Sequence, residues 1–293
     1  MEIYTYKEND GTIYDVYKND LKYNNINVDN IEGNIINKKI NYKSIEYRIQ
    51  EFYNGDNGEK TKTLDLSKLD LELLPDNLPK IIDYLFLSQN SLNYIDDLSY
   101  LKNLVCLDLS DNNLSELPIL PNNIEELSIK NNYITNIDII KHINLKRLDC
   151  SNNKIEFIPH IPSLEILYCN KNKITKLNNY NNLKKIICND NLLNQIENIP
   201  KLKILECDSN KLTSISEFPY LEELYCSDNN IFILDKLNNL VILHCFNNNI
   251  TKIQYFPQLK ELICDYNNIL LNKSYNINTI KKYKNNKVEF TFK

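Results

Sequence analysis

Apolar side chains recur at a fixed spacing along most of this chain. Residues 183–193 set out a pattern that four further copies repeat at a strict 19-residue interval, up to residue 269. The shared pattern is L-x-x-L-x-[LC]-x-x-N-x-[LI], and its eleven positions are numbered from the first leucine. A fixed period in this range indicates a solenoid, in which each repeat forms one coil that stacks on its neighbours.

Positions 4 and 6 predict one short strand in every coil. Side chains alternate between the two faces of a strand, so apolar residues two positions apart face a common core. The apolar residues at positions 1 and 11 lie on the turns that carry the chain round. One coil buries too little apolar surface to fold alone, so stability requires stacking and hydrogen bonds between coils.

Position 9 is asparagine in ten coils. An amide side chain both donates and accepts, so a buried asparagine can satisfy backbone groups in the bend of its own coil and of the next one. A buried backbone group without a partner costs about 1–3 kcal/mol, which explains why this residue type hardly varies. The predicted structural ladder contains Asn90, Asn112, Asn132, Asn153, Asn172, Asn191, Asn210, Asn229, Asn248 and Asn267.

The pattern extends over residues 61–272 and predicts about eleven coils. The first coil is irregular, because Leu69 stands at position 9. Return segments with paired prolines, at residues 74–79, 117–121 and 158–162, predict extended backbone on the side opposite the strands. We therefore predict an α/β-type solenoid dominated by β structure, with one parallel sheet and a largely extended opposite side.

This sequence resembles the leucine-rich repeat family through the eleven copies of that motif, which cover about 210 of the 293 residues. The resemblance implies a horseshoe with the parallel sheet on its concave side. The composition, rich in Asn, Ile and Lys, is similar to that of leucine-rich repeat proteins of large DNA viruses and AT-rich protists. The paired prolines resemble the short repeats of secreted bacterial effectors.

Residues 1–60 do not repeat. The runs at residues 3–6 and 13–17 predict a hairpin about an Asp-Gly turn, and residues 55–60 predict a linker. The segment is interpreted as a cap over the first coil or as a separate small domain. A possible helical stripe contains Ile45, Ile49 and Phe52.

Residues 273–293 also depart from the repeat. Ile277, Ile280 and Tyr283 stand at roughly helical spacing, and a β-rich run follows them. A bare last coil would expose a core face and an unpaired strand edge. This segment is therefore interpreted as a C-terminal cap.

Seven of the eight cysteines occupy position 6, where earlier coils have Leu or Ile. Free cysteine behaves as a small hydrophobe. Strands about 4.8 Å apart keep in-register Cβ atoms farther apart than the roughly 3.5–4.5 Å that a disulfide favours. A reduced, buried ladder in an intracellular protein is therefore favoured over a metal site or redox relay. Its members are Cys150, Cys169, Cys188, Cys207, Cys226, Cys245 and Cys264.

Composition argues against several functions. The mean hydropathy is −0.44, no apolar run is long enough to cross a membrane, and the first residues lack the features of a signal peptide. A net charge of −5 argues against a nucleic-acid partner. The three histidines are scattered, and the four glycines all precede residue 60, too few for a phosphate-binding loop. We expect a cytoplasmic location (the host cytoplasm if the chain is viral), with no metal, cofactor, small-molecule substrate or membrane partner.

The strands offer a surface instead. Positions 3, 5, 7 and 8 point away from the core into the concave side, and many of them are apolar or aromatic in the central and late coils. Clusters of this kind with a charged rim mark protein contacts, although drift of β-rich positions towards Ile and Tyr would give a similar pattern. The candidate partner-binding residues are Ile166, Tyr168, Lys185, Ile187, Ile204, Glu206, Glu223, Tyr225, Ile242, His244, Phe246, Ile263 and Tyr266.

The function predicted from the sequence is non-enzymatic binding of another protein through the concave face. Two alternatives stay open. Residues 1–60 could make the chain an adaptor that recruits a second protein, such as ubiquitin machinery. They could also hold an unrecognised active site, although the segment contains no His and no Cys.

Overall fold

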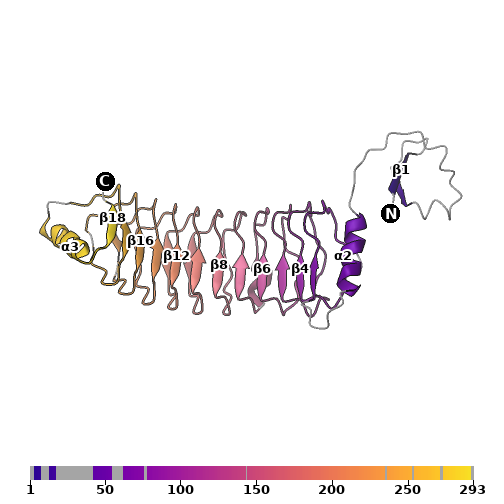
Figure 1. The fold of residues 1–293 in the computed structure, drawn as a ribbon, viewed down its shortest axis with the longest axis horizontal. Helices are drawn as coiled ribbons and strands as arrows, with labels where there is room; N and C mark the ends of the chain where they lie inside the picture. The colour runs from indigo at the N-terminus through magenta and orange to yellow at the C-terminus, as the bar shows by residue number, and fades with distance from the viewer. Residues whose placement is uncertain are drawn as a thin grey trace.

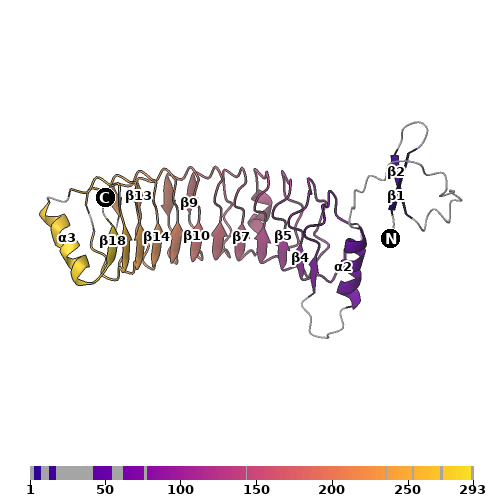
Figure 2. The same ribbon diagram turned by 45° about the horizontal axis from the view of Figure 1, so that its top comes forward.

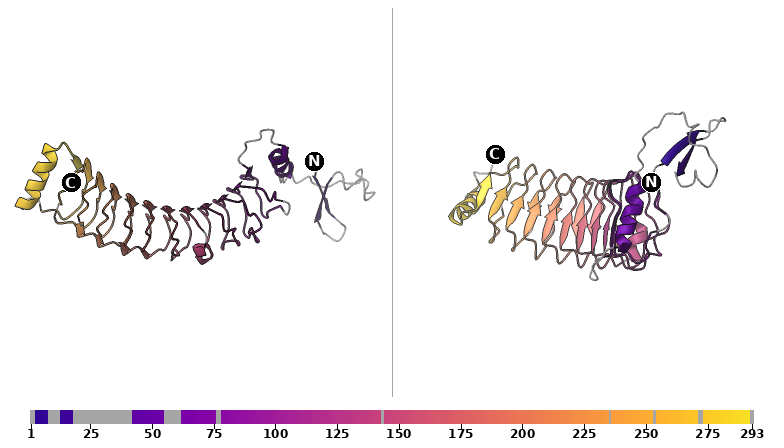
Figure 3. Two further views of the ribbon diagram at one scale, coloured as in Figure 1. Left: turned by 90° about the horizontal axis from the view of Figure 1, so that it is seen from below. Right: turned by 45° about the vertical axis from the view of Figure 1, so that its right-hand side comes forward.

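The computed structural model describes residues 3–7, 13–17, 42–54, 62–75, 78–142, 144–234, 236–252, 254–270 and 273–291. One strand from every coil joins a single parallel sheet that runs the length of the solenoid (Figure 1). Seen along its edge, the solenoid curves as a shallow arc, with α2 (Tyr42–Asn54) and α3 (Ser274–Asn285) at opposite ends (Figure 3, left). The predicted solenoid is confirmed.

The long sheet has twelve strands, and eleven of them correspond to coils 1–11 of the repeat. Each of these covers positions 3 to 5, and equal positions of neighbouring coils pair, as Leu167, Ile186 and Leu205 do. In coil order the eleven strands are β3 (Thr63–Asp65), β4 (Tyr84–Phe86), β5 (Cys106–Asp108), β6 (Glu126–Ser128), β7 (Arg147–Asp149), β8 (Ile166–Tyr168), β10 (Lys185–Ile187), β12 (Ile204–Glu206), β14 (Glu223–Tyr225), β16 (Ile242–His244) and β17 (Glu261–Ile263). The twelfth is β18 (Glu289–Thr291).

The opposite side of the solenoid is largely extended, as predicted. Two short parallel pairs lie there, β9 (Lys176–Asn178) with β11 (Gln195–Glu197) and β13 (Ser214–Ile215) with β15 (Ile233–Leu234). Figure 2 separates β9 and β13 from the long sheet. The one short helix on the described returns is the 3-10 turn η2 (Asp138–His142).

Side chains at positions 4 and 6 fill the core. Leu148, Leu167 and Ile186 at position 4 are fully buried, and so are Cys150 and Cys169 at position 6. Full burial of one such side chain contributes roughly 1.5–3 kcal/mol. Because every coil supplies the same positions, the buried residues form one continuous cluster from α2 to α3.

The asparagine at position 9 links each coil to its neighbour. Asn191 Nδ2 donates to the carbonyl of Cys188 in its own coil at 3.1 Å and to that of Cys169 in the preceding coil at 2.9 Å. Its Oδ1 accepts from the Ile174 N–H of the same preceding coil at 3.0 Å. The position-9 asparagine was predicted to bond to its own coil and to the next one. Its second partner is instead the preceding coil, so that part of the prediction was wrong.

Position 8 adopts left-handed backbone in every coil, although no coil has glycine there. The φ angles lie between 51° and 61°. Asparagine and aspartate tolerate this region better than other residues with a Cβ atom. The residues concerned are Lys68, Gln89, Asp111, Asn131, Asn152, Lys171, Asp190, Ser209, Asp228, Asn247 and Tyr266.

Helix α2 covers the first coil. Ile45 and Ile49 are buried in the same core cluster as the coils, and Phe52 packs against it, which confirms the helical stripe. The strands β1 (Ile3–Lys7) and β2 (Ile13–Tyr17) pair antiparallel, as predicted. The predicted linker at residues 55–60 and the Asp-Gly turn lie outside the described residues.

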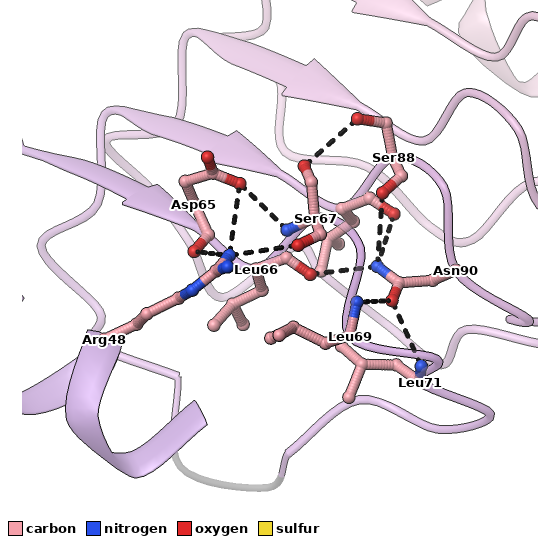
Figure 4. Close-up of polar contacts among 9 residues, drawn as sticks. Arg48, Asp65, Leu66, Ser67, Leu69, Leu71, Ser88 and Asn90 are labelled. Carbon is pink, nitrogen blue, oxygen red and sulfur yellow. Dashed lines mark hydrogen bonds and ion pairs between the residues drawn. The ribbon is translucent and has the colours of Figure 1, made fainter. Parts of the chain in front are cut away.

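Arg48 on α2 completes the hydrogen bonds of coil 1. Along the sheet, the position-6 and position-8 N–H groups of one coil donate to the position-5 and position-7 carbonyls of the following coil, as Leu66 N donates to Phe86 O. Coil 1 has no preceding coil, so its carbonyls at Asp65 and Ser67 lack those donors. Arg48 Nη1 donates to both, at 2.8 and 3.0 Å (Figure 4). One guanidinium therefore replaces two missing backbone donors.

A helix and a strand follow the last coil at the C-terminal end. β18 pairs in parallel with β17, and Tyr283 of α3 is fully buried. The Tyr283 hydroxyl donates to the Gln254 carbonyl at 2.6 Å and accepts from the Phe256 N–H at 3.0 Å. Ile280 packs against the core, whereas Ile277 faces outward.

We expect Asn191→Ala to lower the free energy of unfolding by about 1–3 kcal/mol, because buried backbone groups of two coils lose their partner. Asn178→Ala, on the exposed face of β9, is the control and should leave stability nearly unchanged. Urea denaturation measures both. Equal effects of the two substitutions would contradict the ladder.

We expect Arg48→Met to cost about 1–2 kcal/mol, because the carbonyls of coil 1 lose a charged donor while the apolar stem is kept. Arg147→Met, which leaves coil 1 intact, is the matched control. Hydrogen exchange should show faster opening of coils 1 and 2 in Arg48→Met alone. An unchanged exchange pattern would show that the helix caps the coil by apolar packing only.

Candidate protein-binding face

The outer side of the long sheet carries two rows of side chains. Positions 3 and 5 point away from the core, as the partly exposed, buried, partly exposed pattern of β8, β10, β12, β14, β16 and β17 shows. Eleven of the thirteen candidate residues lie in these rows. They are half-buried rather than exposed, since in-register neighbours about 4.8 Å away cover one another.

Tyr225, His244 and Glu261 form a cluster across three neighbouring strands. The rings of Tyr225 and His244 meet edge to face at 4.8 Å, and His244 Nε2 lies 2.7 Å from Glu261 Oε1. Partial burial raises the pKa of Tyr225, and the charges of Glu223, Glu206 and Glu261 raise it further. The hydroxyl therefore lies in a negative environment.

Tyr168 lies between two cations. The Arg147 guanidinium is 4.8 Å from its ring centroid, and the Lys185 ammonium is 5.7 Å from it. Contacts of this geometry contribute about 0.5–1 kcal/mol where they are exposed. Arg147 was absent from the predicted set, although it stands at position 3 directly before Ile166 in the same row.

Coils 8–11 present a surplus of carboxylates on this face. Burial raises the pKa of Asp208, and the neighbouring charges of Glu206 and Asp228 raise it further, against the lowering effects of its hydrogen bond to Ser227 and of His244. In these coils positions 3, 5, 7 and 8 contain no Lys and no Arg. The carboxylates of coils 8–11 therefore have no Lys or Arg beside them at these outward positions.

Several polar side chains on this side accept hydrogen bonds from backbone N–H groups. In the early coils, Asp65, Asp108 and Asp149 at position 5 accept from the position-7 N–H of their own coil. In the central coils the acceptor comes from position 7 of the preceding coil, as when Asn189 accepts from Asp208 N. These groups therefore have a structural task, which argues against their use as a catalytic acid–base pair.

A row of charges borders the face at position 2. Lys146 pairs with Glu125, Lys184 with Glu165, and Lys203 with Glu222, at 2.7, 2.6 and 2.9 Å. These pairs are largely exposed, so each contributes little to stability. The charges at position 2 therefore cancel within these pairs, and they do not neutralise the charged side chains at positions 3 and 5.

The position-6 thiols lie behind this face, in the core. All seven are buried, and burial raises the pKa of Cys245 to about 12. Cys106 is the exception, at position 3 of β5, where partial burial and the charges of Glu126 and Asp108 raise its pKa to about 11. Thiols of this kind are not activated as nucleophiles at neutral pH.

The described residues contain no group of three His, Cys, Asp or Glu side chains that could hold a metal ion. His160 contacts the Tyr180 ring on the return side, far from the partners of His244. The side chain of His142 lies outside the description. Within the described chain, no helix has the length and hydrophobicity to span a bilayer.

Tyr266 differs from the other residues of the face. Its side chain is 65% exposed, it meets the Phe246 ring edge to face at 5.9 Å, and its φ is 54°. A bulky aromatic side chain in left-handed backbone is an outlier that costs on the order of 1 kcal/mol. The exposed ring therefore stands at a position where the backbone favours a smaller polar residue.

Comparison with known proteins agrees with this geometry. Residues 143–182, which cover coils 5 and 6, match the family model described as Leucine Rich repeats (2 copies). No curated protein matches the sequence. Two coils thus match the leucine-rich repeat family model, in agreement with the repeat pattern.

Solved structures share the fold. The leucine-rich repeat domain of APL1B is 20% identical, with 83% of this chain and 91% of that chain covered and a TM-score of 0.60. The LRIM1/APL1C complex is 20% identical, over 76% of this chain and 54% of that one, with a TM-score of 0.57.

We expect Tyr266→Asn to raise the free energy of unfolding by about 1 kcal/mol, because asparagine tolerates left-handed backbone. Asn247 already stands at this position in coil 10, where it donates to Asp228. Denaturant melts measure the stability of Tyr266→Asn and of the control Tyr220→Asn, which removes an exposed ring outside position 8. A loss of stability in Tyr266→Asn would show that the ring supports the last coil.

Proposed function

We propose that this chain is a non-enzymatic scaffold that binds another protein through its concave face. One observation carries the proposal: apolar and aromatic side chains continue from coil 6 to coil 11 on a sheet face that nothing in the described chain covers. Paired charges at position 2 of coils 4–9 border them along one side. Protein interfaces combine an apolar, aromatic centre with a polar rim of this kind.

The dimensions of the face support a protein partner. The six strands of coils 6–11 span roughly 24 Å at about 4.8 Å per strand. All thirteen candidate residues belong to this stretch, with Tyr225 and His244 near its middle. A neighbour of the same fold is known in the LRIM1/APL1C complex, which fits a partner of protein type.

We propose that residues 1–60 act as a cap that covers the first coil. The packing of Ile45 and Ile49 in the solenoid core and the bonds from Arg48 support it. The adaptor alternative retains one supporting observation, because β1 and β2 form a sheet of their own, apart from the twelve-stranded one. A truncated chain that starts at residue 42 keeps α2 and tests this alternative directly.

We also propose a reducing, intracellular location. Seven unpaired thiols in one buried row support it, since they serve as core hydrophobes while they remain reduced.

We expect Tyr225→Ala to weaken partner binding by more than about 1 kcal/mol, because aromatic anchors near the centre of an interface carry most of its energy. The melting temperature should change little. Tyr220→Ala removes a ring that is 58% exposed outside the two rows, and it should affect neither property. Proteins captured from the natural cell by full-length chain, quantified by mass spectrometry, provide the readout.

Two further arms separate the alternatives. A triple variant that lacks the rings of Tyr168, Tyr225 and His244 should lose the captured partner, whereas the chain from residue 42 should keep it. Retention by the triple variant together with loss on truncation would place the partner on the N-terminal segment. Unfolding of Tyr225→Ala would show that the ring is part of the core.

A further inference from the structure

We propose that coils 8–11 of the concave face bind an extended, basic segment of the partner protein, whose Lys or Arg side chains contact Glu206, Glu223 and the Tyr225 ring. This inference rests on the proposed function and adds the chemistry of the partner. It concerns four neighbouring strands, β12, β14, β16 and β17.

Charge complementarity is the first argument. The outward positions of coils 8–11 carry six carboxylates, and the one basic residue type there is His244, which faces Glu261. The six are Glu206, Asp208, Glu223, Asp228, Glu261 and Asp265. Position 2 of these coils carries two lysines, Lys203 and Lys260. Lys203 is paired with Glu222, so Lys260 alone is too little to neutralise the carboxylates. The excess of negative charge is therefore a local property of this face and does not merely reflect the net negative charge of the whole chain.

The electrostatics within the face agree with this surplus. Neighbouring carboxylates raise the pKa values of both Asp208 and Tyr225, in addition to the effect of burial. A cation bound here would relieve repulsion among groups that the fold already holds together.

Aromatic rings supply the second argument. Tyr168 in coil 6 has Arg147 and Lys185 of its own chain against its ring. Tyr225, Phe246 and Tyr266 in coils 9–11 have no such intramolecular cation among the described contacts. Rings beside carboxylates suit lysine and arginine, because the ring attracts the cation and the stem while the carboxylate binds the head group.

The spacing of the rows indicates an extended segment. Four strands about 4.8 Å apart cover roughly 14 Å, which an extended chain spans with about four or five residues at ~3.3 Å each. Side chains two residues apart on such a segment point to the same side. Two or three basic side chains of one short segment can therefore reach the carboxylates of neighbouring coils.

The test uses fluorescein-labelled octalysine and octaglutamate as probes, with the full-length chain and fluorescence anisotropy at near-physiological salt. We expect octalysine to bind and octaglutamate not to bind. The double variant Glu206→Gln, Glu223→Gln should weaken octalysine binding about tenfold or more, since two charged contacts are lost. Tyr225→Ala should weaken it more than Tyr220→Ala does.

The matched control is the double variant Glu197→Gln, Glu217→Gln, which removes the same charge from the return side of the solenoid. An equal loss in both double variants, or no octalysine binding to the wild type, would overturn the inference. Thermal melts exclude unfolding as the cause. If the capture experiment still shows a partner that requires Tyr225 but not the two glutamates, the proposed function stands and only the basic chemistry fails.

Discussion

The hydrogen bonds of the position-9 asparagines determine how the coils stack. Each amide serves carbonyls of its own coil and of the preceding one and accepts an N–H from the preceding coil, as Asn191 does. The asparagine is therefore useful only where a preceding coil exists. Coil 1 has no preceding coil, and the buried Leu69 stands at its position 9. Arg48 from α2 donates to its backbone carbonyls instead. At the other end β18 supplies backbone partners directly, so the two ends are closed by different chemistry.

The sequence predicts most of the fold because the repeat specifies the same local structure eleven times. The strands, the buried cysteines and the extended returns follow from the period and the apolar spacing. For the terminal segments, which do not repeat, the apolar spacing indicates a possible helical stripe at Ile45, Ile49 and Phe52 and helical spacing at Ile277, Ile280 and Tyr283. Arg48 could not be predicted, since its partners lie 17 and 19 residues away and carry no periodic signal. The left-handed backbone at position 8 was not predicted either, although six of the eleven residues there are Asn or Asp, which tolerate it.

The candidate face could be predicted in part from the sequence. Strand alternation places Tyr225 and His244 on one side, but their contact at 4.8 Å depends on the in-register pairing of β14 and β16. The role of Arg147 follows from the same register, one strand before the first candidate residue. Half-burial of the rows could not be foreseen from one coil, because the covering atoms come from the neighbouring coils.

The repeat leaves few positions whose residue type is not required by the fold. Residues that differ from the usual type at a repeat position are therefore informative. Position 7 is polar in every coil except coil 10, where Phe246 stands, and position 8 is polar or charged in every coil except coil 11, where Tyr266 stands. These two departures meet each other across neighbouring coils, ring against ring. Compositional drift would scatter such changes over unrelated coils. Their contact lies on the acidic end of the face, where we propose that a basic segment binds, and it has some cost in the stability of the last coil.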